Sequence, residues 1–338
     1  MPAVSVIIVN YNGLPHLKEC LDSLRRQTFE DFEIVLVDNA SADDSVRFVK
    51  SNYAEVTVIE NLKNLGYGGG NNVGIKASRG KYLALLNNDT RVDARWLQRL
   101  VETAEEDETI GMCASKILNY YHQDIIDNTG LLMYRDGIGR GRGRLEKDIG
   151  QYDSEGEVFF PSGCAGLYKK EMLDEIGPLD EDFFLYVEDV DIGLRGRIAG
   201  WRCVYVPDAV VYHKYSATTE PYSPLKAYLV ERNRIWVVIK CFPFRMIVSS
   251  LFYTMVRYAL QAYGAIAGRG ASGKIVQSHS LLETLKILVQ AYISALRSFG
   301  TILKKRREVM QMKKVSNRDI AGWLVRFGIG VKEVALKE

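Results

Sequence analysis

The feature that most constrains the fold is an alternation of short apolar runs with helical patterns over the first 110 residues. The runs are rich in Val, Ile and Leu, which is typical of strands buried in a parallel sheet, and they cover residues 4–10, 33–38, 56–60 and 82–87. Between them, apolar residues recur at helical spacing, at Leu14, Leu17, Leu21 and Leu24 and again at Trp96, Leu97, Leu100 and Val101. We therefore expect an α/β fold with an open, mostly parallel sheet flanked by helices.

Polar residues follow each predicted strand, where ligands bind in sheets of this kind. Asn10 and Tyr11 follow the first strand, Asp38 ends the second, and Asn87 with Asp89 follow the fourth. Asn and Asp are also common at helix caps and in turns, so a capping role stays open for each position taken alone. Because other residues could cap the next helix, we expect Asp38 to contact a nucleotide.

A glycine-rich stretch, "NLGYGGGNNVGI", covers residues 64–75. Counted from Gly66, the dinucleotide pattern G-x-G-x-x-G fails at Asn71, and no Gly-Lys-Ser/Thr follows, which excludes the phosphate loop of nucleoside triphosphatases. We expect a tight turn that brings backbone close to a ligand and starts a helix. In that interpretation Asn71 and Asn72 cap the helix and line the site.

An acidic cluster of Glu188, Asp189 and Asp191 begins a predicted helix that ends near Gly200. Acids in a first helical turn are also favoured by the helix dipole. Aromatic residues directly before the cluster provide a low-dielectric setting that raises a carboxylate pKa, so we expect at least one of these acids to be catalytic.

Two further residues suit a divalent cation. Mg²⁺ or Mn²⁺ bound with a nucleoside diphosphate needs only one or two protein carboxylates, and Asp89 can supply one. His213 ends a predicted strand, where a histidine is commonly structural, but its imidazole could also be a ligand for Mn²⁺.

Cysteines and charge indicate the compartment and the division of the chain. Five cysteines without a C-x-x-C pair argue against a disulfide framework and a zinc site and favour a reducing compartment, and no signal peptide is predicted at the amino terminus. Residues 1–225 carry 24 basic and 36 acidic side chains, a net charge of −12, whereas residues 226–338 carry 20 and 6, a net charge of +14. We expect an acidic catalytic domain over 1–225 and a basic, apolar helical region over 226–338.

The basic region is predicted to lie on a membrane surface. Its longest charge-free runs, Met246–Val256 and Tyr258–Gly268, have 11 residues each, whereas a spanning helix needs about 20. An amphipathic stretch then ends in Lys304-Lys305-Arg306-Arg307, a pattern typical of helices that bind anionic lipid. A helical appendage packed on the catalytic domain or in a dimer is the alternative. Nucleic acid is not expected, because no recognition motif accompanies the charge.

Six motifs in order over roughly residues 3–240 resemble the family 2 glycosyltransferases, and most closely their bacterial rhamnosyltransferase-like branch. The motifs are "VIIVNYNG", "VLVDNAS", "NLGYGGGNNVGI", "LLNNDT", "SGCAGLYKKE" and "YVEDVDIGLRGRIAGWRCVYVPDAVVYH". The resemblance implies the nucleotide-binding α/β fold called GT-A and an inverting reaction.

The resemblance also implies roles for single residues. Asn10, Tyr11 and Asp38 would hold the nucleoside of a nucleotide-sugar, with Asn71 and Asn87 nearby. Asp89 would be the metal-binding acid of the family's Asp-x-Asp signature, although here the first acid is replaced by Asn87. His213 would complete the site for Mn²⁺ or Mg²⁺, and Asp189 would be the general base. Ser162, Gly163 and Glu188 would line the pocket for the sugar and acceptor.

The function expected from these roles is transfer of a sugar, rhamnose in the nearest branch, from a dTDP- or UDP-sugar to a hydroxyl group. The acceptor would be a glycan or a polyprenyl-diphosphate-linked glycan of the cell envelope, at the cytoplasmic face of the membrane. Two alternatives remain. A nucleotidyltransferase would need an early basic loop, where "NYNGLPHLKE" offers only Lys18. A non-catalytic sugar-nucleotide-binding membrane scaffold would explain Asn87 in place of an acid.

Overall fold

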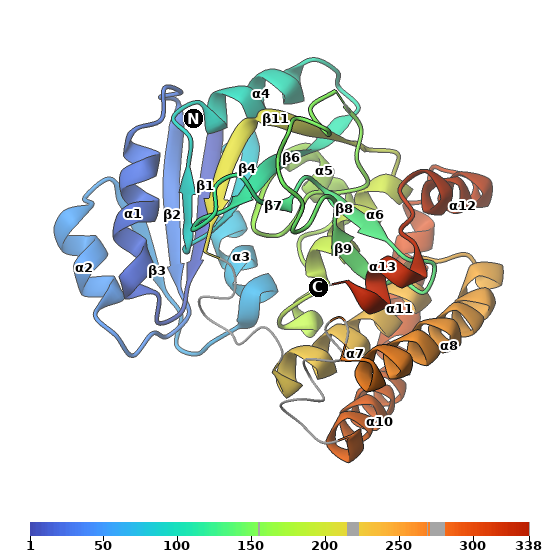
Figure 1. Ribbon diagram of the computed structural model, residues 1–338. Helices are drawn as coiled ribbons and strands as arrows, with labels where there is room; N and C mark the ends of the chain where they lie inside the picture. The colour runs from blue at the N-terminus through green and yellow to red at the C-terminus, as the bar shows by residue number, and fades with distance from the viewer. Residues whose placement is uncertain (155, 215–222, 269, 271–280, 338) are drawn as a thin grey trace. The chain divides into compact units, whose positions relative to one another are not determined.

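The computed structural model describes residues 1–154, 156–214, 223–268, 270 and 281–337 (Figure 1). The chain divides into two compact units. The first unit contains Met1–Leu131 and Gly141–Thr218, and the second contains Leu132–Arg140 and Thr219–Glu338. The candidate site residues of the sequence analysis all belong to the first unit.

The four predicted strands form one half of a sheet in the first unit. They are β1 (Val4–Asn10), β2 (Phe32–Asp38), β3 (Val56–Glu60) and β4 (Tyr82–Asn87). Their order is β3-β2-β1-β4, and every neighbouring pair is parallel. The carboxyl ends of all four strands therefore meet at one edge, as the sequence predicts.

The other half of the sheet corrects the prediction of a mostly parallel arrangement. β10 (Ala165–Lys169) lies between β4 and β6 (Ile110–Asn119) and is antiparallel to both. β11 (Arg202–His213) is parallel to β6, while the short strands β5 (Thr90–Val92) and β7 (Ile126–Asn128) pair antiparallel with β11 and β6. A long connection precedes β10, and its described residues contain no helix. Parallel neighbours usually need a crossover helix, so without one β10 can run antiparallel, and the sheet is mixed.

Helices cover both faces of the sheet in Figure 1. They are α1 (Leu14–Arg25), α2 (Ser45–Asn52), α3 (Gly66–Ala77), α4 (Trp96–Glu105), α5 (Lys170–Ile176), the short 3₁₀ turn η1 (Glu181–Phe183) and α6 (Glu188–Ile198). The predicted stripes of α1 and α4 bury Leu21 and Trp96 in one core with Ile8 of β1. Side chains alternate along a strand, so Ile7 and Val9 point to the opposite face, toward α3.

The glycine run corrects a second expectation. α3 already begins at Gly66, so Asn71 and Asn72 lie inside the helix and do not cap it. A Cβ at Gly70 would lie 2.7 Å from Val9 Cγ1, and one at Gly74 would lie 2.4 Å from Ile7 Cγ2. These glycines let α3 pack directly on β1, which explains a run that fits no phosphate-binding pattern.

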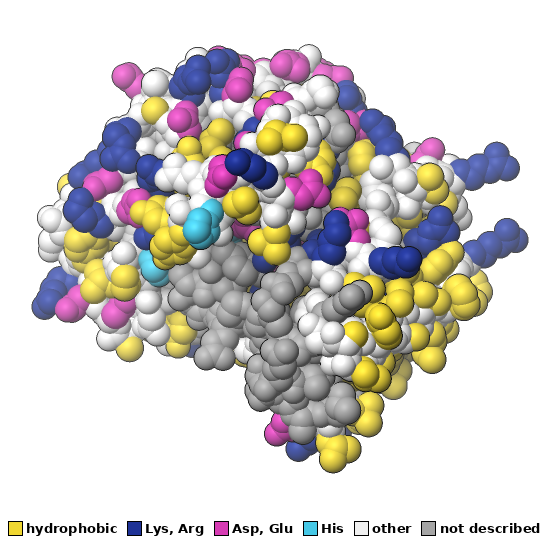
Figure 2. Space-filling model, in the orientation of Figure 1, with side chains coloured by type: hydrophobic (Ala, Val, Ile, Leu, Met, Phe, Trp, Pro, Cys, Tyr) yellow, Lys and Arg dark blue, Asp and Glu magenta, His cyan; other side chains and the backbone are white. Residues whose placement is uncertain are grey.

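The second unit is helical. Its helices are α7 (Pro224–Cys241), α8 (Phe244–Ile266), α10 (Leu281–Arg297), α11 (Phe299–Gln311), α12 (Asn317–Arg326) and α13 (Val331–Leu336). Two short strands, β8 (Leu131–Met133) and β9 (Gly139–Gly141), pair as a separate sheet. Figure 2 shows hydrophobic side chains gathered over α8. Within the described ranges, no helix has both the length and the apolar character needed to cross a membrane.

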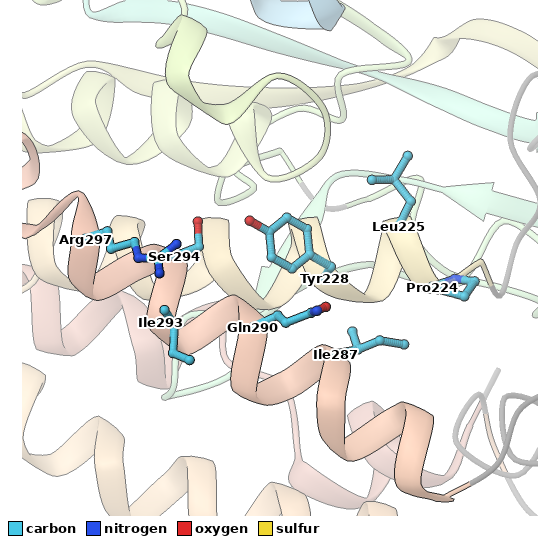
Figure 3. Close-up of a pocket in the computed structure, with 8 residues that line it drawn as sticks. All are labelled: Pro224, Leu225, Tyr228, Ile287, Gln290, Ile293, Ser294 and Arg297. Atoms are coloured by element: carbon cyan, nitrogen blue, oxygen red, sulfur yellow. The ribbon is translucent and has the colours of Figure 1, made fainter.

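Buried charges hold the second unit together. Arg257 of α8 donates to Asp136 (Nε to Oδ2, 2.6 Å) and to Glu231 of α7 (Nη2 to Oε2, 3.0 Å). Arg234 pairs with the same Glu231, and all four side chains are almost fully buried. An open groove of about 580 Å³ lies between α7 and α10, with Tyr228 on one side and Ile287 and Arg297 on the other (Figure 3).

Candidate active site

The ends of β1 and β2 are joined by a hydrogen-bonded pair. Asn10 is fully buried, and its Nδ2 donates to Oδ1 of Asp38 at 3.0 Å. The backbone N–H and the hydroxyl of Ser41 donate to the two oxygens of Asp38, at 2.9 and 2.6 Å. A carboxylate has about four lone-pair sites, so Asp38 can still accept hydrogen bonds from a ligand. Tyr11, next to Asn10, is 40% exposed.

The same network extends to the end of β4. Asn88 donates from Nδ2 to Oδ1 of Asn10 at 2.8 Å, so the amide of Asn10 bridges Asp38 and the "NND" segment. Asn87, the residue in place of the first signature acid, is partly exposed. Asn71 lies in the second turn of α3, where it is 1% exposed and donates to the carbonyl of Tyr67 at 2.9 Å. Asn10 and Asn71 thus both use their side chains within the protein.

Asp89 faces His213 at the ends of β4 and β11. Both are buried, and Nε2 of His213 lies 3.4 Å from Oδ1 of Asp89. In the part of the chain that the structure describes, this oxygen has no hydrogen-bond partner. Burial acts to raise the pKa of Asp89, but the close contact with the imidazole of His213 outweighs it, so the net pKa is below its ordinary value.

The other nitrogen of His213 contacts a residue that the sequence analysis did not single out. Nδ1 lies 2.7 Å from Oδ2 of Asp127 on β7, and Oδ1 of Asp127 accepts a 2.7 Å hydrogen bond from Arg144. Burial acts to lower the pKa of His213, but the neighbouring sulfur of Cys164, the hydrogen bond to Asp127 and the contact with Asp89 raise it well above its ordinary value. A three-residue strand such as β7 is too short to show a periodic pattern, so Asp127 could not be singled out from the sequence.

Asp89 and His213 together fit a divalent cation. Neighbouring ligands of an octahedral ion with bonds of about 2.1 Å lie roughly 3 Å apart. The 3.4 Å between Oδ1 of Asp89 and Nε2 of His213 is close to that separation, and an oxygen and an imidazole nitrogen are suitable donors for Mn²⁺. Among the described residues, no group of three or more His, Cys, Asp or Glu side chains could hold an ion. Phosphate oxygens and water would have to complete the coordination.

Asp189 lies in the first turn of α6, beside the strand-end cluster. Its Oδ2 accepts the backbone N–H of Gly163 at 3.0 Å, and its Oδ1 accepts that of Val190 at 2.8 Å. Burial raises the pKa of Asp189 despite these hydrogen bonds. Its neighbour Glu188 is 7% exposed, its Oε2 has no partner among the described residues, and burial together with the charge of Asp189 raises its pKa. Two acids with raised pKa values therefore lie side by side.

The third acid of the cluster has a structural contact. Asp191 is fully buried and accepts from Nε of Arg195, one turn later in α6, at 2.8 Å. The same guanidinium donates to the carbonyls of Ile176 and Gly177. Asp191 thereby helps to anchor α6 to the segment after α5.

A strained turn positions the start of α6. Phe184, Tyr186 and Val187 have φ angles of 63°, 68° and 73°, in the left-handed region that costs a non-glycine residue about 1–3 kcal/mol. The carbonyl of Phe184 accepts the backbone N–H of Tyr67, in the first turn of α3, at 2.7 Å. Gly66 allows this contact, because a Cβ there would lie 2.2 Å from the same carbonyl oxygen.

A short segment joins the two halves of the site. Gly163 donates to Asp189, and the hydroxyl of Tyr67 donates to the carbonyl of Gly163. The next residue, Cys164, accepts the backbone N–H of Asn87 at 2.9 Å. Ser162 is partly exposed, and its hydroxyl accepts from the backbone N–H of Cys164. Asp189 of α6 and Asn87 at the end of β4 thus contact two consecutive residues, Gly163 and Cys164.

His16 and Tyr67 are further polar residues near the site that sequence reasoning missed. His16 lies in the first turn of α1, and its buried Nδ1 has no hydrogen-bond partner among the described residues. Burial and the charge of Lys214 lower its pKa, against the opposing charge of Asp89. His16 follows Pro15 at the start of a predicted helix that comes directly after a strand end. This position was the one feature of the sequence that could have indicated a site residue.

Comparisons with known proteins place the chain among sugar transferases. Residues 5–177 match the family described as Glycosyl transferase family 2. The chain is 27% identical over 268 residues to the N-acetylglucosaminyl-diphospho-decaprenol L-rhamnosyltransferase of Mycobacterium tuberculosis, which covers 68% of this chain and 85% of that protein. It is also 29% identical over 236 residues to an uncharacterized protein of Sinorhizobium fredii, covering 64% of this chain but only 25% of that protein.

Solved structures share the fold. A GalNAc-T7 structure with UDP, GalNAc and Mn²⁺ has a TM-score of 0.58 at 21% identity, covering 71% of this chain and 48% of that one. The mannosyltransferase PcManGT of Pyrobaculum calidifontis, in complex with GDP-Man and Mn²⁺, has a TM-score of 0.54 at 17% identity, covering 92% and 86%. Residues 1–349 of S. aureus TarS in complex with UDP also give 0.54 at 17% identity, covering 97% and 92%.

Proposed function

The chain belongs to glycosyl transferase family 2, and we propose that it transfers a sugar from a nucleoside-diphosphate donor to a hydroxyl group, with inversion at the anomeric carbon. One observation carries the proposal. The segment Gly163–Cys164 joins an acid with a raised pKa, Asp189, to the strand-end cluster that contains Asp89 and His213. A base and a diphosphate site on the two sides of one short segment are what a single displacement requires.

Each group then has a chemical task. Asp38, held by Asn10 and Ser41, accepts hydrogen bonds from the nucleoside, and Tyr11 offers an exposed ring beside it. A Mn²⁺ or Mg²⁺ ion held by Asp89 and His213 would offset the negative charge that develops on the departing diphosphate. Asn87 and Asn71 stay nucleotide-side candidates, although the amide of Asn71 is engaged inside α3.

Asp189 acts as the general base. The N–H groups of Gly163 and Val190 fix the orientation of its carboxylate, and its raised pKa makes it a stronger base than an exposed aspartate. It removes the proton of the acceptor hydroxyl as the oxygen forms its bond to the anomeric carbon and the bond to the diphosphate breaks. Ser162, Gly163 and Glu188 line the space in which sugar and acceptor meet.

Rhamnose as the sugar, dTDP or UDP as the carrier, and a polyprenyl-diphosphate-linked glycan as the acceptor complete the proposal. The sugar and the acceptor are supported by the mycobacterial relative, which is an N-acetylglucosaminyl-diphospho-decaprenol L-rhamnosyltransferase, and UDP is supported by the solved structures that contain it. We place the reaction in cell-envelope polysaccharide synthesis at the inner face of the membrane.

The membrane part of the proposal is supported by the second unit. One face of α8 exposes apolar side chains at helical spacing, with Leu251, Phe252 and Met255 each 65–68% exposed. Arg245 on the same helix, and Lys304 and Arg307 on α11, are exposed cations that suit anionic lipid. Arg306 has a different role, because it donates to the carbonyls of Ile239 and Phe242 at the end of α7.

The catalytic proposal is tested by calorimetric titration of the full chain with UDP, dTDP, GDP, CMP and NAD, with and without Mn²⁺. Binding of dTDP or UDP that strengthens with Mn²⁺ is the expected result. Binding of NAD alone, or of none of the five, would overturn the nucleotide site. Nucleotide binding without transfer from any donor would favour the scaffold alternative.

The membrane proposal is tested by co-sedimentation with vesicles that contain anionic lipid. Leu251→Gln with Phe252→Gln should release the chain from the vesicles. Val325→Gln is the matched control, because Val325 on α12 is 74% exposed and lies on a different helix. Equal sedimentation of the α8 variant and the Val325→Gln control would rule out α8 as the lipid-binding face. Equal sedimentation of the wild type with neutral and with anionic vesicles would rule out a role for the exposed cations.

A further inference from the structure

Asp127 lies between Arg144 and His213 at the edge of the proposed cation site. Its Oδ2 is 2.7 Å from Nδ1 of His213, and its Oδ1 accepts a 2.7 Å hydrogen bond from Arg144. The side chains of Asp127 and Arg144 are 11% and 20% exposed. The two residues in contact, Asp127 and His213, are 86 positions apart in the chain.

The sheet explains how the contact forms. β6 has β11 on one side and β7 beside its carboxyl-terminal half on the other, with His213 opposite Asn119 and Ile126 opposite Leu118. Asp127 follows Ile126 directly. Asp127 on β7 and His213 on β11 therefore lie at the same edge of the sheet, with β6 between them. The imidazole is thereby held from two sides, by Asp127 at Nδ1 and by Asp89 at Nε2.

We propose that Asp127 is the positioning residue for His213 in cation binding. This inference rests on the proposed function. In the neutral imidazole that a cation requires, Nδ1–H would donate to the carboxylate of Asp127, which would leave Nε2 with its lone pair as the ligand atom on the side of Asp89. Arg144 fixes the carboxylate in turn, so that neither ring rotation nor the other tautomer is favoured. Carboxylates that hold a ligating histidine in this way typically contribute about 10–100-fold in metal affinity.

A purely structural role would give a different result. A buried aspartate between an arginine and a histidine could simply stabilise the fold, and its loss would then lower stability without changing the affinity for metal. The first unit offers a matched control in Glu157, whose side chain is 17% exposed and pairs with Arg197. Glu157→Gln removes a carboxylate–arginine pair of the same kind, 30 positions along the chain from Asp127 and outside the contacts described for His213 and Asp89.

The experiment measures Mn²⁺ affinity directly, by electron paramagnetic resonance of free Mn²⁺ in titrations of the full chain with dTDP or UDP present. We expect Asp127→Ala to weaken binding about 10–100-fold. Asp127→Asn keeps the volume and one acceptor oxygen for Nδ1–H, so it should retain the fold and lose less affinity than Asp127→Ala. Glu157→Gln should bind Mn²⁺ as the wild type does, and urea unfolding of each variant reports its stability.

The outcomes separate this inference from the proposed function. Wild-type affinity in both Asp127 variants would overturn the positioning role. An equal loss in Glu157→Gln and Asp127→Asn would also overturn it, because a general loss of stability would then account for the effect. If the wild type binds dTDP or UDP but no Mn²⁺, the inference fails while the nucleotide site stands. If it binds neither, the proposed function fails with it.

Discussion

Replacing Asp189 by Asn tests the assignment of the general base with the least disturbance of the fold. The two side chains have nearly the same volume, and the amide oxygen can still accept one of the two backbone N–H groups, from Gly163 or from Val190. The other N–H loses its acceptor, which costs about 1–3 kcal/mol. Removing a carboxylate whose pKa is raised by burial offsets part of that cost, so the variant should remain folded.

The effect on transfer should be much larger than the effect on stability. A positioned general base contributes about 10²–10⁴-fold to the rate. That corresponds to about 3–5 kcal/mol in the activation barrier. The assay measures release of the nucleoside diphosphate from the donor that the binding titrations identify, in the presence of lipid-linked acceptor. Binding of the nucleotide itself should be unchanged, because Asp38 and Asp89 are untouched.

Asp191→Asn is the matched control for this experiment. It changes a buried acid two residues later in α6 that pairs with Arg195. It should lower stability, while the folded enzyme keeps most of its turnover. An Asp189→Asn enzyme that transfers sugar within tenfold of the wild type would refute the assignment, as would an Asp191→Asn enzyme that is stable but equally inactive.

Three further predictions concern the pKa of Asp189, the turn at Gly66 and the buried charges of the second unit. Because burial raises the pKa of Asp189 above the ordinary 3.8, transfer should be lost as the pH falls through that raised value, and an acid limb at or below pH 3.8 would contradict the base assignment. Gly66→Ala should cost about 1–3 kcal/mol in urea unfolding, because φ is +73° and the new Cβ would meet the carbonyl of Phe184; unchanged stability would show that the turn adapts. Burial alone would raise the pKa of Glu231, but Arg234 and Arg257 lower it from 4.5 to about 2. The stabilisation that ionised Glu231 gives to the fold is therefore fully present above pH 4.5 and is lost as the pH falls from 4.5 to about 2. Glu231→Gln should therefore cost about 3–5 kcal/mol at neutral pH and flatten the pH dependence of stability in that window, and a wild-type dependence would contradict the pairing.

The sequence by itself determined the parallel half of the sheet and the helices that cover it. Buried strands and amphipathic helices leave a local periodic pattern, and the strand predicted at residues 4–10 is β1 with the same bounds. The same pattern put Asp38 and Asp89 at strand ends, where the parallel arrangement brings them to one edge. Their roles and that of Asp189 remain proposals, but their shared location follows from local order.

Tertiary structure decided the rest. The direction of β10, the packing of Gly74 against Ile7, and the contact of Asp127 with His213 depend on segments that are far apart in the chain. A residue's neighbours along the chain report whether it is buried, but they do not report which distant residue it meets, because that contact depends on how whole strands and helices pack. For this reason the sequence indicated Asp89 and His213 as one side of the proposed cation site, and only the folded sheet showed that the carboxylate of Asp127 contacts the histidine.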